Sequence, residues 1–437
     1  MEIENSKATR RTLSPGIKLL LLAVMALVLL IPQIFIDLLV DSRRDYSEEV
    51  QETIAQSWGG EQCVRPIWLS FPVLKKDKDD SDSYTVHYQA DSVKMDVEIT
   101  TQTRYRGFYS AVLYHAKIKV EGYIDPAVLK EEENIDGFSY DISPNGYITT
   151  LIREPLGLKS NLVVDMEGKE YHLIASNVSP LFDDGKTFTA PIDLRKDPLG
   201  KFSYTYELNG YKDLQFYVQT DAMDVNLKLH YPSPSFSGDF LPDERTISDS
   251  MTTAHWTLFS SASTFPQNTV RETNTRYYGY DEVDYPRSFS VSTQFTDVYY
   301  RAIERSLKYA ILIIVFTFLT FFFTDTLSKT NMPMIGYLLT GCAILLFYTL
   351  LLSISEYLAF GWAYLISCLA IIGMIGVYFW SFVRSIKATM VCVGILVILY
   401  VFLYLILQMD TFPLLVGSIF LFIVLGLVMY LSRKLTW

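Results

Sequence analysis

Long apolar segments limit what this chain can fold into more strongly than any other feature of its sequence. A helix rises about 1.5 Å per residue, so roughly 20 apolar residues can cross the ~30 Å hydrocarbon core of a bilayer. One such segment, Ile17 to Val40, lies near the N-terminus, and five more follow Lys308. The five are approximately Tyr309 to Thr324, Ile335 to Ile354, Leu358 to Trp380, Ala388 to Gln408 and Phe412 to Leu431. This pattern predicts a membrane protein with an α-helical transmembrane bundle of six spans.

The first apolar segment has two interpretations, an uncleaved anchor or a cleaved signal peptide. A signal peptide combines a basic start with an apolar stretch of roughly 7 to 15 residues and a small-residue cleavage site. Here the apolar run is longer and ends in IPQIFIDLLV, without an Ala-x-Ala signature. We therefore expect an anchor, with Pro32 kinking its helix rather than ending it.

Basic residues in short flanking segments orient a membrane protein, because the end richer in Lys and Arg stays in the cytoplasm. Arg43 and Arg44 follow the first span, and the basic residues before it are Lys7, Arg10, Arg11 and Lys18. Carried through six spans, this orientation places on the cytoplasmic side Lys329, Arg384, Lys387, Arg433 and Lys434. We expect both termini in the cytoplasm and Asp41 to about Arg305 in the periplasm of a bacterium, with the helices in the inner membrane.

Composition divides the chain into four expected parts. Residues 1–40 form a basic cytoplasmic tail and the N-terminal anchor. Residues 41–60 form an amphipathic stalk helix, in which Tyr46, Val50, Ile54 and Trp58 recur every four residues. Residues 61–305 form a periplasmic β-rich domain, and residues 306–437 form a five-helix transmembrane bundle.

Within the expected periplasmic domain the dominant period is two, which is typical of half-buried strands. In AVLYHAKIKV the apolar or aromatic side chains from Val112 to Val120 alternate with polar ones. Asn145-Gly146 and Asn209-Gly210 are candidates for hairpin turns. We expect a large, mostly β domain that is sandwich-like.

Cysteine usage predicts no disulfide framework. Cys63 is the single cysteine of the expected periplasmic domain. The other three, Cys342, Cys368 and Cys392, are expected to be buried in spans.

The stretch YPSPSFSGDFLP, Tyr231 to Pro242, follows a strand pattern and interrupts it with prolines, which cannot donate to a strand ladder. One interpretation is a packed corner of the sandwich, with the side chains of Phe236, Phe240 and Leu241 tucked beneath a turn. The other is a loop that binds a partner, because ordered irregular loops often carry function. The candidate interaction residues are Tyr231, Pro232, Phe236, Gly238, Phe240 and Leu241.

The most distinctive membrane element is the outer turn within LLLSISEYLAFGWAYL, residues 350–365. Its aromatic residues are typical of a belt at the membrane interface. A second, compatible interpretation is a docking face for the β domain, with Ser355 and Glu356 as hydrogen-bonding and charged contacts. The candidate residues here are Ser355, Glu356, Tyr357 and Trp362.

No pattern indicates a catalytic, cofactor or metal site. The acidic run from Asp77 lacks the Gly and Glu of a calcium loop. Asp325 and the other ionisable residues of the C-terminal spans lie at ends or turns, where water or headgroups can solvate them. The histidines lack the spacing of metal ligands and are expected on strand surfaces: His87, His115, His172, His230 and His255.

The run KLHYPSPSFSGDFLPDERTIS, followed by AHWTLFS, resembles the hallmark of the CreD (Cet) family of bacterial inner-membrane proteins. The similarity extends to SRRDYSEEVQETIAQSW, to RYRGFYSAVLYHAKIKVEG and to the layout of a single anchor followed by a bundle. Arg65-Pro66 stands where the family's Gly-Pro is expected, and Pro333 and Gly336 stand where a His and a Gln are expected. The resemblance implies an association with envelope stress, colicin tolerance and a sensor-kinase and response-regulator pair, without an established reaction.

Two functions remain open from the sequence. The favoured one is a non-catalytic envelope protein, in which the periplasmic β domain engages a partner or ligand and the bundle anchors or relays that engagement. The alternative is a transporter or a membrane-embedded enzyme that acts on a lipid-linked or hydrophobic substrate. The expected partners are membrane lipids and an envelope protein, with no nucleic acid and no cofactor.

Overall fold

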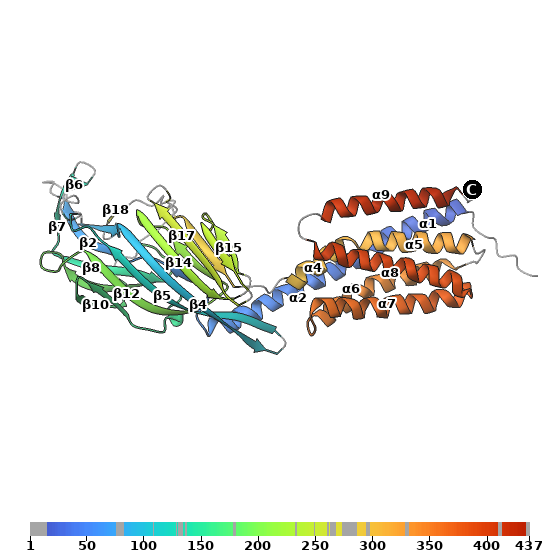
Figure 1. The fold of residues 1–437 in the computed structure, drawn as a ribbon, viewed down its shortest axis with the longest axis horizontal. Coiled ribbons are helices and arrows are strands. Elements are labelled where there is room, and N and C mark those ends of the chain that lie inside the picture. The colour runs from blue at the N-terminus through green and yellow to red at the C-terminus, as the bar shows by residue number, and fades with distance from the viewer. Residues whose placement is uncertain are drawn as a thin grey trace, which may run out of the picture. The chain divides into compact units, whose positions relative to one another are not determined.

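The computed structural model describes residues 15–433, apart from several short segments (Figure 1). The segments outside the description are 76–82, 108, 128, 130–133, 136–137, 178–180, 232–233, 249, 260–261, 263–267, 273–285, 294–297, 328–331 and 410–412. Several residues singled out in the sequence therefore lie outside the described residues: Lys7, Arg10, Arg11, the acidic run from Asp77, Pro232, Lys329 and Lys434.

The chain forms two compact units. Met1–Ser47 and Thr296–Trp437 make up the first, which we call the helical unit, and Glu48–Phe295 make up the second, which we call the β unit. The helical unit contains α1 (Pro15–Val28), the first part of α2 (Leu30–Gln56), α4 (Val298–Lys308), α5 (Ala310–Leu327), α6 (Met334–Ser355), α7 (Phe360–Val383), α8 (Ile386–Gln408) and α9 (Pro413–Ser432).

The helical unit has the apolar helices that the sequence predicts. Within the described residues, four helices are long and apolar enough to cross a membrane: Gly16–Gln56, which joins α1 and α2, and α6, α7 and α8. The bent pair of α4 and α5 makes a fifth if it is counted as one span, and Leu415–Tyr430 is a shorter apolar helix. The chain is therefore a membrane protein with several helical spans.

Two of these helices are interrupted. As expected, Pro32 does not end its helix, and the interruption lies nearby, at Leu29. The expected span from Tyr309 corresponds to α5, which meets α4 at 46°. There the Tyr309 N–H bonds to the Ser306 carbonyl three residues earlier, at 3.0 Å, which tightens the turn.

A buried ion pair corrects the expectation that Asp325 is solvated at a helix end. The Asp325 carboxylate is buried and pairs with the Lys18 ammonium of α1. Its Oδ1 atom also accepts a hydrogen bond from the Met332 N–H at 3.0 Å. The first turn of α1 and the last turn of α5 therefore lie together at one end of the helical unit.

One cysteine of the helical unit also differs from expectation. Cys368 and Cys392 are buried, whereas the side chain of Cys342 is exposed on the surface of this unit. The sequence could not show which face of α6 is buried, because this helix is apolar on all sides.

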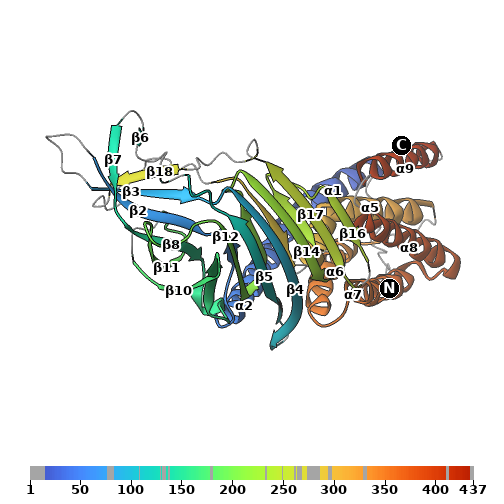
Figure 2. The ribbon, with the colours of Figure 1, turned by 60° about the vertical axis from the view of Figure 1, so that its left-hand side comes forward.

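The β unit contains one large and one small sheet (Figure 2). The 15-stranded sheet has, in order, β16 (Glu244–Ile247), β17 (Thr252–Phe259), β14 (Ala222–His230), β4 (Ser92–Arg106), β5 (Tyr109–Tyr123), β12 (Lys201–Tyr211), β9 (Leu162–Met166), β10 (Lys169–Ala175), β11 (Lys186–Asp193), β8 (Asn145–Ile152), β2 (Trp68–Lys75), β3 (Ser83–Gln89) and β18 (Asn268–Glu272), with β7 (Phe138–Ile142) and β6 (Asn134–Ile135) off this path. The four-stranded sheet has the order β1 (Gln62–Val64), β13 (Asp213–Tyr217), β19 (Ser288–Ser292) and β15 (Ser235–Gly238).

The two sheets share one hydrophobic core. Phe216 and Phe289 of the small sheet belong to the same buried cluster as Met95, Tyr206 and Trp256 of the large sheet. The period-two expectation is confirmed on β5, where Tyr114, Ala116, Ile118 and Val120 are buried in this cluster. The mostly β character of the unit thus follows from alternation in the sequence.

Both predicted Asn-Gly turns are wrong. Asn209-Gly210 lies inside β12, and the positive φ of 59° that marks a turn belongs to Lys212. A Cβ atom on Gly210 would lie 2.2 Å from Cζ of Tyr114, so this glycine serves the close approach of a ring. Asn145-Gly146 begins β8, whereas the preceding β7 pairs with β2 and β6.

The predicted stalk helix exists as the second part of α2, but its buried face is shifted by one residue. Gln51 and Ala55 are buried, whereas Tyr46 is exposed. Ala55 packs with Leu113 of β5, and the Tyr211 hydroxyl donates a hydrogen bond to Oε1 of Gln51 at 2.8 Å. A polar residue therefore occupies the contact face because it has a buried polar partner.

The YPSPSFSGDFLP stretch carries the chain from one sheet to the other. It leaves β14 of the large sheet, adds β15 to the small sheet beside β19, and then leads to β16 of the large sheet. Gly238 has a φ of 100°, and a Cβ atom there would lie 2.5 Å from the Ser288 carbonyl oxygen. The prolines and the glycine thus accompany a change of sheet.

Candidate functional site

Aromatic packing holds part of the YPSPSFSGDFLP stretch on the core. The Phe236 ring meets the Trp256 ring edge to face, with 5.7 Å between their centroids. Tyr231 and Phe240 are also partly buried against the core cluster. Leu241 corrects the expectation of an apolar side chain tucked beneath a turn, because it is 69% exposed.

The stretch also supplies an edge strand to each sheet. In the described residues, β15 pairs only with β19, and β16 pairs only with β17. Register places Ile247 opposite the fully buried Thr252, so its side chain lies on the core side of the sheet. Ile247 is nevertheless 51% exposed, so no residue that the structure describes fully covers the core side of β16 at this position.

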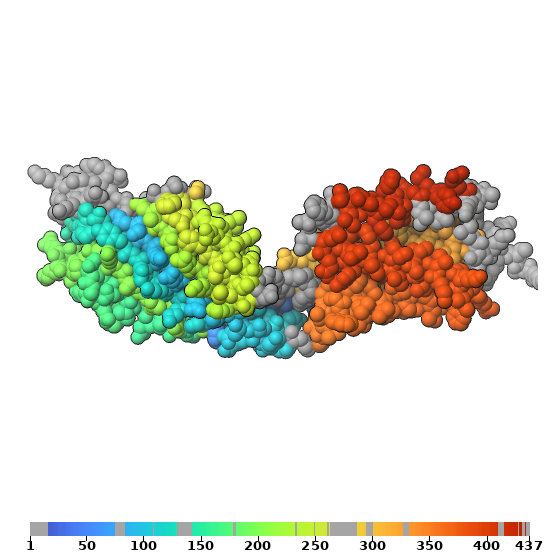
Figure 3. Space-filling model, viewed as in Figure 1, coloured from blue at the N-terminus to red at the C-terminus, as the bar shows by residue number. Residues whose placement is uncertain are grey.

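We call β16, together with Leu241, the open edge. Its outer face borders a groove of about 410 Å³ that lies over β14, β16 and β17. The charged or ionisable side chains of Lys228, Glu244 and His255 line this groove. In the space-filling view, β14 to β17 form a continuous yellow-green surface (Figure 3). Apolar side chains, charges and free strand edges therefore occur together here.

The predicted membrane turn, between α6 and α7, presents fewer polar groups than expected. The Ser355 hydroxyl is buried and donates to the Leu352 carbonyl at 2.9 Å, so it is already used within its helix. Glu356 is half-buried, and Tyr357 and Trp362 are exposed. The two exposed aromatic side chains fit an interfacial belt.

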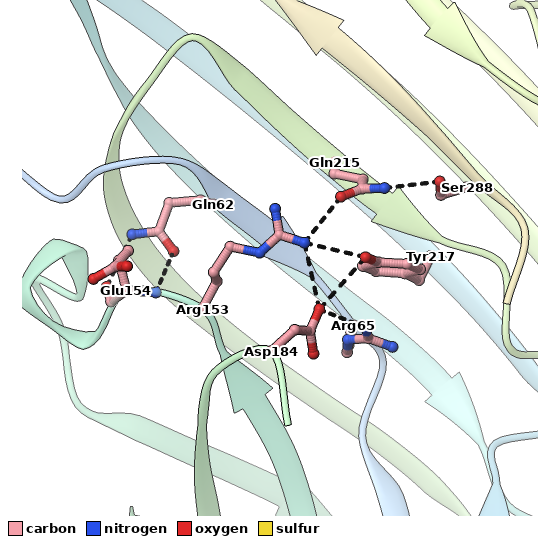
Figure 4. Close-up of polar contacts among 8 residues, drawn as sticks. All are labelled: Gln62, Arg65, Arg153, Glu154, Asp184, Gln215, Tyr217 and Ser288. Atoms are coloured by element: carbon pink, nitrogen blue, oxygen red, sulfur yellow. Dashed lines mark hydrogen bonds and ion pairs between the residues drawn. The ribbon is translucent and has the colours of Figure 1, made fainter. Parts of the chain in front are cut away.

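An arginine cluster that the sequence did not reveal lies elsewhere in the β unit (Figure 4). One oxygen of Asp184, Oδ2, accepts from Arg65 at 2.8 Å and from Arg153 at 3.3 Å. Arg153 also donates to Oε1 of Gln215 at 3.0 Å and to the Tyr217 hydroxyl at 3.1 Å. Two guanidinium groups thus share a single carboxylate.

Aromatic rings shield the more deeply buried of these two cations. The Arg65 side chain is fully buried, and its guanidinium carbon lies 3.9 Å from the Phe182 ring centre and 3.6 Å from that of Tyr217. Its Nε and Nη1 atoms have no hydrogen-bond partner among the described residues. The ring faces and Asp184 therefore offset the cost of desolvating this charge.

Cys63 lies beside this cluster as a neutral thiol. Burial raises its pKa, although the positive charges of Arg65 and Arg153 act in the opposite direction. The side chain packs with Trp68 and Phe182, among others. This environment is that of a structural cysteine rather than a reactive one.

Most histidines lie on strand surfaces, as expected, and three of them pair with carboxylates. His115 lies 3.7 Å from Glu207, His230 lies 3.2 Å from Glu98, and His255 lies 3.0 Å from Asp224. His87 is an exception, because it is fully buried beside Ser70, with 2.9 Å between Nδ1 and Oγ. The described residues include no group of three or more side chains that could hold a metal ion.

Comparison with known proteins gives one strong likeness. A family model described as "Inner membrane protein CreD" matches residues 14–437. The inner membrane protein CreD of Escherichia coli (strain K12) is 26% identical over 430 residues, which cover 94% of this chain and 91% of that protein. Among solved structures, an M1 zinc metallopeptidase from Deinococcus radiodurans is 9% identical and covers 47% of this chain and 43% of its own, with a TM-score of 0.19. A score this low does not indicate a shared fold.

Replacing Phe236 with Ala removes a ring from the Trp256 face and should destabilise the β unit. Full truncation of a core Phe typically costs about 3–5 kcal/mol, so this partly buried ring should cost about 2 kcal/mol. Denaturant titration of the full chain in detergent, followed by tryptophan fluorescence, measures the loss. Leu241→Ala is the matched control and should change stability by less than about 0.5 kcal/mol. Equal midpoints for both variants would refute the packing of Phe236.

Replacing Asp184 with Ala leaves a buried guanidinium without its carboxylate and should lower the unfolding midpoint strongly. Loss of one partner from a buried ion pair typically costs about 3–5 kcal/mol. Combining Asp184→Ala with Arg65→Met should recover part of this loss, because the buried charge is then gone. Glu170→Ala, which removes an exposed carboxylate on β10, serves as the control. If the double variant were less stable than Asp184→Ala, the electrostatic explanation would fail.

Proposed function

The chain belongs to the CreD family of inner membrane proteins, and from this membership we propose that it is a non-catalytic protein of the cell envelope whose β unit engages a protein partner. The helical unit anchors this engagement or relays it across the membrane. In this proposal the chain has six spans, both termini lie in the cytoplasm, and Asp41 to about Arg305 lies in the periplasm. Envelope stress and colicin tolerance, which the family resemblance implies, are the processes in which we expect it to act.

The open edge is the observation that carries this proposal. Ile247 lies on the core side of its strand and is still half exposed. An extended segment of another protein can pair with the free backbone of β16 while its side chains cover Ile247 and Leu241. The partner we propose is therefore an extended polypeptide segment that adds a strand to the large sheet.

The composition of β16 supports a specific partner over non-specific association. Natural edge strands avoid aggregation by being short and by carrying charged side chains. β16 has four residues, and two of them, Glu244 and Arg245, are charged. Such an edge accepts a partner that provides complementary charges and rejects an arbitrary strand.

The Lys18–Asp325 ion pair supports the proposed topology. Two crossings separate the start of the first span from the end of the second, so these two ends lie on the same side of the membrane if each span crosses it once. The contact joins the first turn of α1 to the last turn of α5, as two antiparallel spans require.

A second candidate function is a carrier or a membrane-embedded enzyme for a lipid-linked or hydrophobic substrate. The same ion pair favours it, because ionisable side chains buried among membrane helices often mark a pathway. Asp325 is nearly inaccessible to solvent, and the Tyr337 ring lies 5.4 Å from the Lys18 ammonium.

Photo-crosslinking tests the open edge in the full chain in its own membrane. p-Benzoylphenylalanine at position 247 should give a discrete crosslinked protein under ultraviolet light, whereas the same group at position 174, an exposed site on β10, should not. A synthetic peptide that matches the crosslinked segment should bind the purified chain. Ile247→Lys should weaken this binding at least about tenfold, because it replaces the apolar side chain that the partner covers with a charge that must be desolvated. Ile174→Lys, the matched control, should bind normally.

Two results would contradict this proposal. One is equal crosslinking from positions 247 and 174. The other is a partner peptide whose affinity is unchanged by Ile247→Lys.

A double variant of the Lys18–Asp325 ion pair distinguishes a structural role of the pair from a role in transport. Asp325→Ala should lower the thermal midpoint of the full chain, because it leaves the Lys18 charge buried without its partner. Lys18→Met combined with Asp325→Leu should restore the midpoint. Liposomes with either the native chain or the double variant should show equal proton flux. A flux that the stable double variant loses would favour the second candidate function.

A further inference from the structure

A second groove on the large sheet is separate from the open edge. It has a volume of about 760 Å³ and crosses six neighbouring strands, β17, β14, β4, β5, β12 and β9, near their ends. Strands lie about 4.8 Å apart, so six of them span roughly 24 Å. This length suits an extended ligand with several linked units better than a single small molecule.

Strand addition is restricted in this groove. Each of the strands that cross it has a neighbour on both sides within the sheet, although β16 pairs with β17 only up to His255 and leaves Thr257 to Phe259 paired with β14 alone. Recognition of a ligand across all six strands therefore depends on side chains rather than on backbone N–H and C=O groups. This distinguishes the groove from the open edge, where backbone groups of β16 are free on one side in the described structure.

The charges of the groove disfavour an anionic ligand. Four carboxylate side chains line it, Glu121, Asp165, Glu167 and Asp224, against the ammonium groups of Lys94 and Lys201.

Several of these carboxylates already have partners. Glu121 pairs with Lys119 at 2.5 Å. Glu167 accepts from the Lys201 backbone N–H at 2.7 Å, and Asp224 lies 3.0 Å from Nε2 of His255. The groove therefore offers both hydrogen-bond donors and acceptors, several of them already held in place by partners, and carries a small net negative charge. This combination suits an uncharged polar ligand.

Two aromatic side chains are exposed at the groove. Phe259 ends β17 and is 64% exposed, and Tyr123 ends β5 and is 38% exposed. An exposed ring that lines a polar groove can stack on a flat apolar surface of a ligand that is otherwise polar. Sugar rings have this combination, because they present C–H groups on their faces and hydroxyl groups around their rims.

We propose that this groove binds an uncharged oligosaccharide chain. Phe259 and Tyr123 stack on sugar rings, while Lys94, Lys201 and the flanking carboxylates hydrogen-bond to hydroxyl groups. This ligand class differs from the extended polypeptide proposed for the open edge, so experiments can support or refute the two proposals independently.

The test uses the full chain in a detergent whose headgroup is not a sugar, because alkyl glycosides would compete. Chitohexaose and maltohexaose are titrated by isothermal calorimetry and by tryptophan fluorescence. We expect at least one of them to bind saturably. Phe259→Ala should weaken that binding about tenfold, because it removes the ring that stacks on the sugar. Tyr105→Ala, which removes an exposed aromatic side chain outside the groove, should bind as the native chain does.

Thermal unfolding of each variant confirms that its β unit is intact. The proposal is overturned if neither oligosaccharide binds saturably, or if Phe259→Ala and Tyr105→Ala affect binding equally. Binding of polyphosphate instead of either sugar would also overturn it, since that result requires a groove with positive potential.

Discussion

A row of four aromatic rings joins the two sheets of the β unit, and the remaining features of this unit depend on it. Phe216 stacks on Phe289 at 5.1 Å, Phe289 stacks on Trp256 at 4.6 Å, and Phe236 meets Trp256 edge to face. The row runs from β13 and β19 of the small sheet to β17 of the large one, and returns to the small sheet at β15. The row fixes β15 and β17, which precede and follow the exposed β16 in the sequence. The segments on either side of the open edge in the sequence are thus held by the hydrophobic core.

Local patterns in the sequence predicted the local structure well. Alternation identified β5 and β14, and apolar length identified the membrane helices, because both signals depend on neighbouring residues alone. The Asn209-Gly210 turn failed for a physical reason: the glycine accommodates the Tyr114 ring, which is 96 positions earlier and lies on a neighbouring strand. The buried state of Asp325 was equally invisible, because its partner Lys18 is separated from it by 307 positions.

The candidate site was only partly predictable for the same reason. Composition singled out the YPSPSFSGDFLP stretch, and the structure places Phe236 and Phe240 against the core. Whether a strand lies at an edge depends on the order of all strands in its sheet, so the exposure of Ile247 has no local signal. The arginine cluster shows the limit most clearly, since Arg65, Arg153 and Asp184 come from three distant segments. Arg65 stood out in the sequence only as a departure from a family pattern.

The parallel pairing of β4 with β14 has a consequence for how the β unit is made. Asp96 of β4 and Asn226 of β14, which are hydrogen-bonded neighbours, are 130 positions apart, whereas β4 and β5 meet through a short local turn. Chains are synthesised at roughly 5–20 residues per second, so the β4–β5 hairpin waits on the order of 10 s for β14. Throughout that interval the 15-residue β4 offers a long unpaired edge, rich in β-branched residues, to any other nascent strand. Biogenesis of this protein therefore includes a delay during which one long strand edge of the β unit is without its native neighbour.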